Sequence, residues 1–414
     1  MASPIHRIGF QSHRVMIRKN EREGEAEEEG KRVVLTAPLA LEGGLAAEHR
    51  PPNFLQQLLG LFCNVRPGSD LSRFQLPSLF NMPKSQLQCY GEMVYCYNED
   101  YLCKCAQGQS KLNRFISVVA WSISTTRPAI FGQAPYNPIL GETHHVSRGS
   151  LNVLLEQVSH HPPVTALHAT DTNLNIELNW CHSVVPRFHG TSVEAAIKGK
   201  RQLKLLTFGE NYEMDSPNLM IKLIPPTGAD WIGNVRIRCK DSELEADLCY
   251  YKSHRFLGFG GSSRFVKGTI SHSNTSKTIY QIEGEWDRVV ELKDVHSGEV
   301  MVLYDAKKAI SQLNTPVLGV PQKVWNTEST KVWGELSQAI LSKDWGKASE
   351  IKRRIEEHER KKQRERLSNG KVWIPKHFSV PHSMAGNNNE WECSPLEPLV
   401  PPAPIILPLQ TMGM

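Results

Sequence analysis

The stretch LLEQVSHHPPVTALHAT, residues 154–170, decides how this chain is interpreted. Residues 151–158 are apolar enough to form a β-strand, and adjacent residues of a strand point to opposite faces. The two prolines that follow lack backbone donors, and the first restricts the residue before it to extended conformations. We therefore expect His160 and His161, the histidine pair, at a strand end or bulge, where both rings can reach one point.

Residue chemistry alone leaves four roles open for the histidine pair. Metal binding would need three or four ligands, and the chain has no HExxH motif nearby. Catalysis would need a nucleophile, and the adjacent Ser159 lies outside any G-x-S-x-G elbow. Anion binding needs only donors, which imidazole supplies. A purely structural place at the end of the strand is the fourth interpretation.

Short strand patterns dominate the chain from about residue 142 to 305. NVRIRC, residues 234–239, alternates apolar and polar side chains, and LEADLCY, TIYQIEGEW and EVMVLYDA are similar runs between turn signals. The chain has no βαβ units and no glycine-rich phosphate fingerprint, which argues against a nucleotide-binding parallel sheet. We expect a mainly β protein with helices (α+β), built on a large antiparallel sheet or barrel.

Helical patterns precede and follow this region. Residues 85–128 contain helical material, and the GQAPYNPILGE stretch then breaks regularity. From residue 327 the pattern is helical again, and Asp344 can cap a helix that runs to about Leu367. Lys352, Glu356 and Arg360 share one face of that helix. Two cations that bracket a carboxylate suit a phosphate, and a solvated charged face is the alternative.

An apolar helix is predicted in PPNFLQQLLGLFCNVRPGSD, residues 51–70, ending near residues 67–68. Its polar side holds two glutamines, and the helix carries almost no charge. It either packs into the core or covers a ligand or a membrane. Its apolar face consists of Phe54, Leu55, Leu58, Leu59 and Phe62.

Net charge and cysteine content bear on the kind of partner and on the redox compartment of the protein. The 414 residues carry a net charge of +5, which does not indicate nucleic-acid binding but fits visits to anionic membranes. The nine cysteines do not resemble a secreted disulfide framework, so a reducing, cytosolic compartment is the simplest interpretation. The densest group lacks C-x2-C pairs, so free thiols are favoured over zinc at Cys89, Cys96, Cys103 and Cys105.

Composition divides the chain into three predicted regions. Residues 1–50 are predicted to be a disordered leader, basic at first and then acidic in EREGEAEEEG, with a transit peptide as the alternative for residues 1–20. Residues 51–380 form the predicted domain, with its lid at 51–82, and 381–414 form a proline-rich tail. No apolar run reaches the roughly 20 residues that a membrane-spanning helix needs.

EQVSHHPP, residues 156–163, resembles the signature of the oxysterol-binding-protein-related lipid-transfer family. APYNPILGE (134–142), GEWD (284–287) and WIPKHF (373–378) resemble further family motifs in the family's order, and Lys352, Glu356 and Arg360 match its K-x3-E-x3-R helix. The resemblance covers about residues 53–378 and is closest to short plant-type members with little beyond the lipid-binding domain.

The resemblance implies a β-barrel around an apolar tunnel for one lipid, an N-terminal amphipathic lid and a C-terminal helical region. The ligand would be a sterol or a phosphoinositide, usually phosphatidylinositol 4-phosphate, with no enzyme activity, cofactor or metal. The lid would be the 53–63 helix. The family's head-group contacts would be made here by His160, His161, Lys352, Glu356, Arg360 and Asn137.

One position departs from the family pattern: Ala134 stands where the motif begins with lysine. Loss of one charge-assisted contact to a buried anion costs about 1.5–3 kcal/mol, so phosphoinositide exchange is less secure than sterol binding. Arg127 or Arg148 could substitute for the missing cation.

The expected setting is cytoplasmic, with peripheral contact to anionic intracellular membranes through basic residues near 361–366. A receptor in the endoplasmic-reticulum membrane is a candidate partner, although EREGEAEEEG lacks the aromatic core of a docking motif. Two rival functions remain. The chain could be a lipid-responsive scaffold or sensor that recruits partners through residues 393–408, or a hydrolase or metalloenzyme that uses the histidine pair.

Overall fold

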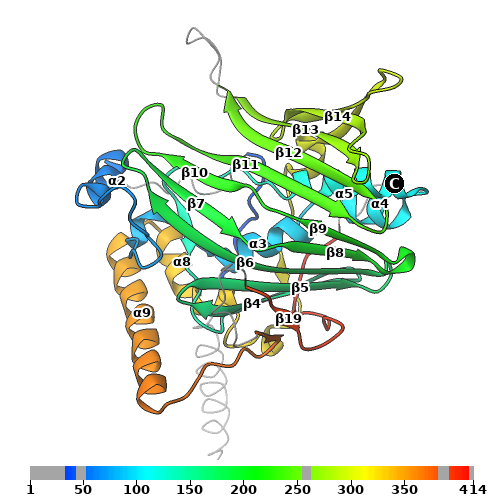
Figure 1. The fold of residues 1–414 in the computed structure, drawn as a ribbon. Coiled ribbons are helices and arrows are strands. Elements are labelled where there is room, and N and C mark those ends of the chain that lie inside the picture. Colours follow the sequence, from blue (N-terminus) through cyan, green and yellow to red (C-terminus); the bar gives the residue numbers. More distant parts are fainter. Residues whose placement is uncertain (1–32, 43–52, 254–262, 381–390, 410–414) are drawn as a thin grey trace, which may run out of the picture.

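The structure, a computed structural model, describes residues 33–42, 53–253, 263–380 and 391–409. The predicted transit peptide and the acidic EREGEAEEEG run both lie outside these residues. One large sheet dominates the described chain, and helices pack within its curve and along one side (Figure 1). None of the helices in the described ranges is both long enough and apolar enough to cross a bilayer.

Sixteen strands form the main sheet, and nearly all neighbouring pairs are antiparallel. Its main path runs β16-β15-β14-β13-β12-β11-β10-β7-β6-β5-β4-β3-β20-β17, with β8 and β9 joined to β6 and β11. The strands are β3 (Thr143–Arg148), β4 (Leu151–His160), β5 (Pro163–Asp171), β6 (Ile176–Phe188), β7 (Ser192–Lys198), β8 (Arg201–Leu205), β9 (Glu210–Met214), β10 (Asn218–Lys222), β11 (Gly228–Cys239), β12 (Leu244–Ser253), β13 (Ser263–His272), β14 (Thr278–Glu285), β15 (Val289–Asp294), β16 (Val300–Asp305), β17 (Val317–Leu318) and β20 (Ile405–Ile406).

Most helices lie in the predicted regions, but α2 ends at Phe62, earlier than the predicted end near residues 67–68, and no pattern predicted α6. Three fall between residues 85 and 128, and Asp344 caps the long C-terminal helix by accepting a hydrogen bond from the Lys347 amide. The helices are α2 (Phe54–Phe62), α3 (Gln86–Tyr95), α4 (Tyr101–Gln107), α5 (Lys111–Ser124), α6 (Ala306–Ile310), α7 (Ser329–Val332), α8 (Gly334–Leu341) and α9 (Trp345–Ser368), with short 3₁₀ turns η3 (Ser78–Phe80), η4 (Leu206–Phe208) and η5 (Pro321–Lys323).

The predicted α+β class is confirmed. In Figure 1 the sheet curves so that β12–β14 lie above and β4–β6 below, with α3, α4 and α5 between them. Apolar side chains of these helices and of the strands share one core, in which Leu87, Phe115, Leu155 and Ile237 are fully buried. The sheet thus wraps around the helices, and β16 and β17 form the two ends of its hydrogen-bonded path.

Two smaller sheets complete the strands. β1 (Asn81–Ser85) and β2 (Ala134–Tyr136) pair in parallel, so the stretch expected to be irregular contains a short strand. β18 (Phe378–Ser379) pairs with β19 (Ser394–Pro395). Both pairs join segments far apart in sequence.

The ends of the described chain correct two expectations. Residues 33–42, part of the predicted disordered leader, pack on the domain, where the Leu39 amide donates to Glu92 (3.0 Å). The proline-rich tail is extended, as predicted, but it does not stand free as a docking segment. Ile405 is completely buried because β20 joins the edge of β3, and the Val400 amide donates to Thr170 Oγ1 (3.0 Å).

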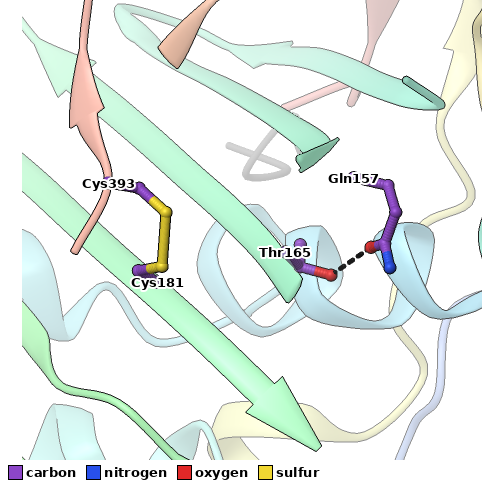
Figure 2. The surroundings of a disulfide bond; sticks show 4 residues. All are labelled: Gln157, Thr165, Cys181 and Cys393. Carbon is purple, nitrogen blue, oxygen red and sulfur yellow. Dashed lines mark hydrogen bonds between the residues drawn. A yellow bond between two sulfur atoms is a disulfide. The ribbon is translucent and has the colours of Figure 1, made fainter. Parts of the chain in front are cut away.

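Cys181 on β6 and Cys393 before β19 form a disulfide across 212 residues of sequence, with their Cα atoms 5.7 Å apart (Figure 2). No spacing pattern in the sequence indicates this pair, and its presence removes the support that cysteine content gave to a reducing compartment. The four cysteines weighed as a zinc site are free thiols, three of them buried. Among the described residues, no three His, Cys, Asp or Glu side chains gather as a metal site requires.

Candidate functional site

A cavity of about 1430 Å³ lies against the inner face of the sheet and is lined mainly by apolar side chains. This volume exceeds the roughly 300–1,000 Å³ of pockets for drug-sized ligands. Alternate residues of β6, β7 and β10 form one wall, because side chains two apart share a face of a strand. Pro186, Ala195 and Leu219 lie side by side across these three strands and all line the cavity.

Helix α3 supplies another part of the lining. Gln86, Cys89, Tyr90 and Met93 follow the i, i+3, i+4, i+7 spacing of one helical face, and all four line the cavity. The opposite side of the same helix is buried in the main core, for example at Leu87 and Val94. The cavity therefore lies between the sheet and α3. One side of this helix lines the cavity, and the other packs in the main core.

The histidine pair lies at the tip of the β4–β5 hairpin and lines the cavity. The register between the two strands shifts between Gln157 and Ser159, and β4 ends at His160. The two rings lie with their centroids 4.6 Å apart. The prediction that a bulge or a strand end would bring both rings to one place is confirmed.

The surroundings of His160 fix its tautomer. Its Nδ1 lies 2.9 Å from the Pro138 carbonyl oxygen, which can only accept, so Nδ1 carries a hydrogen. Burial and the neighbouring His161 lower the pKa of His160, and burial with the charge of Arg73 lowers the pKa of His161. Both rings therefore favour the neutral form near pH 7, and His160 Nε2 becomes a donor only when the ring gains a proton.

The predicted cation–carboxylate–cation ladder is present on α9. Glu356 accepts from Arg360 (3.0 Å) and lies 3.8 Å from Lys352 Nζ, and all three line the cavity. Lys352 is held from a second side, since it donates to Asn81 Oδ1 (2.8 Å) and to the Leu76 carbonyl. Burial lowers the pKa of Lys352, while Glu356 opposes that shift. The alternative of a solvated charged face fits Arg360, whose side chain is 45% exposed, but not Lys352, whose side chain is 14% exposed.

The 134–142 loop brings Asn137 and Ala134 to the same cavity. Glu142 anchors its end: the carboxylate is fully buried and accepts hydrogen bonds from Ser329 (2.7 Å) and the Trp333 indole (2.9 Å). Burial raises the pKa of Glu142 to about 7. The loop is thus attached to the helical region that carries the ladder.

Both arginines that could substitute for the missing lysine donate to backbone carbonyls, and only Arg127 lines the cavity. Arg148 donates to the carbonyls of Tyr95 (3.0 Å) and Tyr97 (2.7 Å) and does not line the cavity. Arg127 lines the cavity but is 2% exposed and donates to the Cys96 carbonyl.

Arg73 is the cation that sequence reasoning missed. It lies on the segment between α2 and η3, lines the cavity and is exposed. Within the part of the chain that the structure describes, it makes no hydrogen bond and no ion pair shorter than 4.0 Å, and its charge acts on both His161 and the Asp70 carboxylate. No motif marks this position.

Helix α2 divides its apolar face between two environments. Phe54 and Leu58 are buried, and Phe62 stacks on Phe188 with ring centroids 5.2 Å apart. Leu58 and Phe62 line the cavity, whereas Leu55 and Leu59 are 51% and 43% exposed. The helix therefore covers the cavity with one edge and presents leucines to the outside with the other.

Glu156, the first residue of the EQVSHHPP stretch, holds the chain after α9 in place. Its carboxylate is fully buried and accepts from the backbone amides of Lys376 (2.8 Å) and His377 (2.9 Å). Next to it, Gln157 Oε1 accepts from Thr165 Oγ1 (2.7 Å), as Figure 2 shows. This part of the motif is structural, and the histidine pair faces the cavity.

The fold and the site together define a sheet-wrapped, lipid-sized apolar cavity with a polar cluster at one part of its wall. The sequence profile of the oxysterol-binding protein family matches residues 60–396. Oxysterol-binding protein-related proteins 4B and 4A of Arabidopsis thaliana are 46% and 45% identical, each over 92% of this chain and 99% of their own length. The chain belongs to the oxysterol-binding protein family, and the resemblance identified from its motifs is confirmed.

Solved structures show the same fold. The Osh1 ORD domain in complex with cholesterol superposes with a TM-score of 0.67 at 19% identity, covering 90% of this chain and 92% of that one. The Osh3 ORD of Saccharomyces cerevisiae in complex with PI(4)P gives 0.61 at 23% identity, covering 87% and 92%.

Proposed function

We propose that the chain binds one lipid, a sterol or phosphatidylinositol 4-phosphate, in the cavity and transfers it between membranes. The cavity itself supports this most strongly, because its volume and apolar walls suit a molecule whose apolar surface must be kept from water. The solved relatives hold cholesterol or PI(4)P in this fold. Helix α2 would act as the lid, and Leu58 and Phe62 would contact the lipid.

A phosphoinositide head group would lie at the polar cluster. Lys352 and Arg360 would bind the phosphate, Glu356 would orient them, and Asn137 would contact the head group or the glycerol region. The histidine pair would bind the same phosphate, with His160 protonated because only its Nε2 remains for the ligand. Arg73 would supply the charge that Ala134 does not, since it lines the cavity and its charge acts on His161.

The protein would work in the cytoplasm as a peripheral visitor to anionic membranes, and a receptor in the endoplasmic-reticulum membrane remains a candidate partner. The scaffold alternative has less support, because Val400, Ile405 and Leu407 of its proposed docking segment, residues 393–408, are buried in the fold. An enzymatic role has little support from geometry: within the described residues, neither histidine hydrogen-bonds to the Ser159 hydroxyl.

Native mass spectrometry of the purified full chain tests lipid occupancy. We expect one bound lipid per protein, and expect Ala195→Trp to empty the cavity because Ala195 lines it between two apolar neighbours. Ala196→Trp is the matched control, since the next residue of β7 faces the other side. A lipid-free wild type after expression in lipid-containing cells, or equal loading of the Ala195 variant, would contradict the proposal.

A further inference from the structure

The segment after α9 exposes two aliphatic side chains beside the cavity. Val372 is 69% exposed and Ile374 is 75% exposed, and both belong to the cavity lining. Trp373 between them is half-buried, so exposure alternates along the segment. We call Val372 and Ile374 the apolar tip. Single exposed apolar residues are ordinary, but two on either side of an anchored tryptophan at a cavity rim are not.

The apolar tip is fixed in place on both sides. The Trp373 ring packs directly on Gly141, where an added Cβ would lie 2.5 Å from the ring atom Cη2. The guanidinium of Arg366 lies over the same ring, 5.7 Å from its centroid. On the other side the amides of Lys376 and His377 are bound by the buried carboxylate of Glu156. These contacts hold the backbone of the apolar tip in place, and the side chains of Val372 and Ile374 stay exposed to water.

The sequence that carries the apolar tip is cationic. Arg366, Lys371 and Lys376 lie within six residues of it, and residues 366–376 contain no acidic side chain. Leu367, also on this segment, is 71% exposed. Apolar side chains flanked by cations suit the interface of an anionic bilayer, where the side chains enter the acyl boundary and the cations meet the head groups.

We propose that the apolar tip inserts into an anionic bilayer and holds the mouth of the cavity against the membrane. This contact is distinct from the lid: α2 shares its apolar residues between the cavity and the outside, whereas the tip is exposed on a rigid support. The proposal rests on the proposed function only in assuming that the cavity opens toward a membrane. The position of the tip in the cavity lining places the bilayer next to the route that a lipid would take.

The test is flotation of the full chain with vesicles of phosphatidylcholine and phosphatidylserine. Val372→Gln combined with Ile374→Gln should weaken binding by about tenfold or more, since two largely exposed aliphatic side chains lose their transfer free energy. The matched control exchanges Val300 and Val302 on β16 for glutamine, because these valines are similarly exposed (53% and 62%) and do not line the cavity.

Two further measurements make the outcome decisive. Val372→Phe with Ile374→Phe should bind at least as tightly as the wild type, which a merely unfolded tip would not. Native mass spectrometry should find the glutamine variant still loaded with lipid, which separates docking from lipid binding. The proposal would be overturned if the glutamine variant bound vesicles as well as the wild type, or if the control variant lost as much binding. It would also be overturned if the glutamine variant lost its bound lipid together with vesicle binding, or if the wild type failed to bind protein-free vesicles.

Discussion

Lys352→Met removes the central cation of the proposed head-group site and keeps the aliphatic stem. In the structure Lys352 Nζ donates to Asn81 Oδ1 (2.8 Å) and to the Leu76 carbonyl, and its side chain is 14% exposed. The ammonium is thus held at one point of the cavity wall before any ligand arrives. A phosphate there would meet a charge whose orientation is already fixed.

The expected loss of affinity follows from the environment of this charge. A hydrogen bond to a charged group contributes about 1.5–3 kcal/mol, and each 1.4 kcal/mol is tenfold in affinity. Because Arg360 at the same site is 45% exposed, water screens part of the field, and we expect the lower end. Phosphoinositide extraction should therefore weaken by about tenfold. Asn81 Oδ1 and the Leu76 carbonyl lose their donor, which lowers the free energy of unfolding, but the desolvation cost of the buried charge is removed as well. The net decrease should be at most about 2 kcal/mol.

The assay is extraction of phosphatidylinositol 4-phosphate from vesicles, with sterol extraction measured in parallel. Sterol binding should be unchanged, since a sterol has no phosphate. Arg353→Gln is the matched control: it alters the next residue of α9, which is exposed, pairs with Glu357 (3.1 Å) and does not line the cavity. Unchanged phosphoinositide extraction by Lys352→Met, or a parallel loss of sterol and phosphoinositide, would refute the head-group assignment.

Three further predictions address separate parts of the site. Phosphoinositide affinity should rise as the pH falls from about 8 to about 6.5, because burial lowers the pKa of both rings of the histidine pair and binding must add a proton. Exchange of the pair for glutamine should flatten this pH profile, and an unaltered profile would contradict proton uptake there. Arg73→Gln should weaken phosphoinositide extraction about fivefold, whereas Arg66→Gln, the control, should not. Equal losses in the two variants would indicate that both arginines attract the membrane in general and would contradict the role of Arg73 at the head group. Glu156→Ala should lower the free energy of unfolding by about 2–4 kcal/mol and speed hydrogen exchange at the amides of Lys376 and His377, and unchanged exchange rates would disprove the anchoring role.

Local patterns predicted much of the fold because local physics determines it. Alternation in 234–239 marked a strand of the main sheet, and Asp344 marked the start of α9. The strand end at the histidine pair was predictable because prolines remove donors from the ladder. The spacing of Lys352, Glu356 and Arg360 showed a shared helical face, but only the fold shows that this face meets the cavity.

The cavity wall could not be predicted in the same way. The alternation of Val193, Ala195 and Ile197 on β7 shows which side chains share a face. It does not show whether that face meets protein or an open cavity, because both environments are apolar. Only the placement of β6 and β10 beside β7 decides between them.

Contacts between distant segments were also beyond sequence reasoning. The proline-rich tail looked like a free extended segment, and its place in the sheet depends on an available edge of β3 about 260 residues earlier. Arg73 carries no motif and became a candidate only because its segment lies beside the histidine pair. The Cys181–Cys393 disulfide likewise depends on β6 and the tail meeting in space.

The most direct test of the central claim is transfer between two vesicle populations, with far less protein than lipid. If the chain is a carrier, each molecule should move many sterol or phosphatidylinositol 4-phosphate molecules from donor to acceptor, and Ala195→Trp should abolish this turnover. Transfer that stops at one lipid per protein would contradict the account and identify a lipid sensor instead.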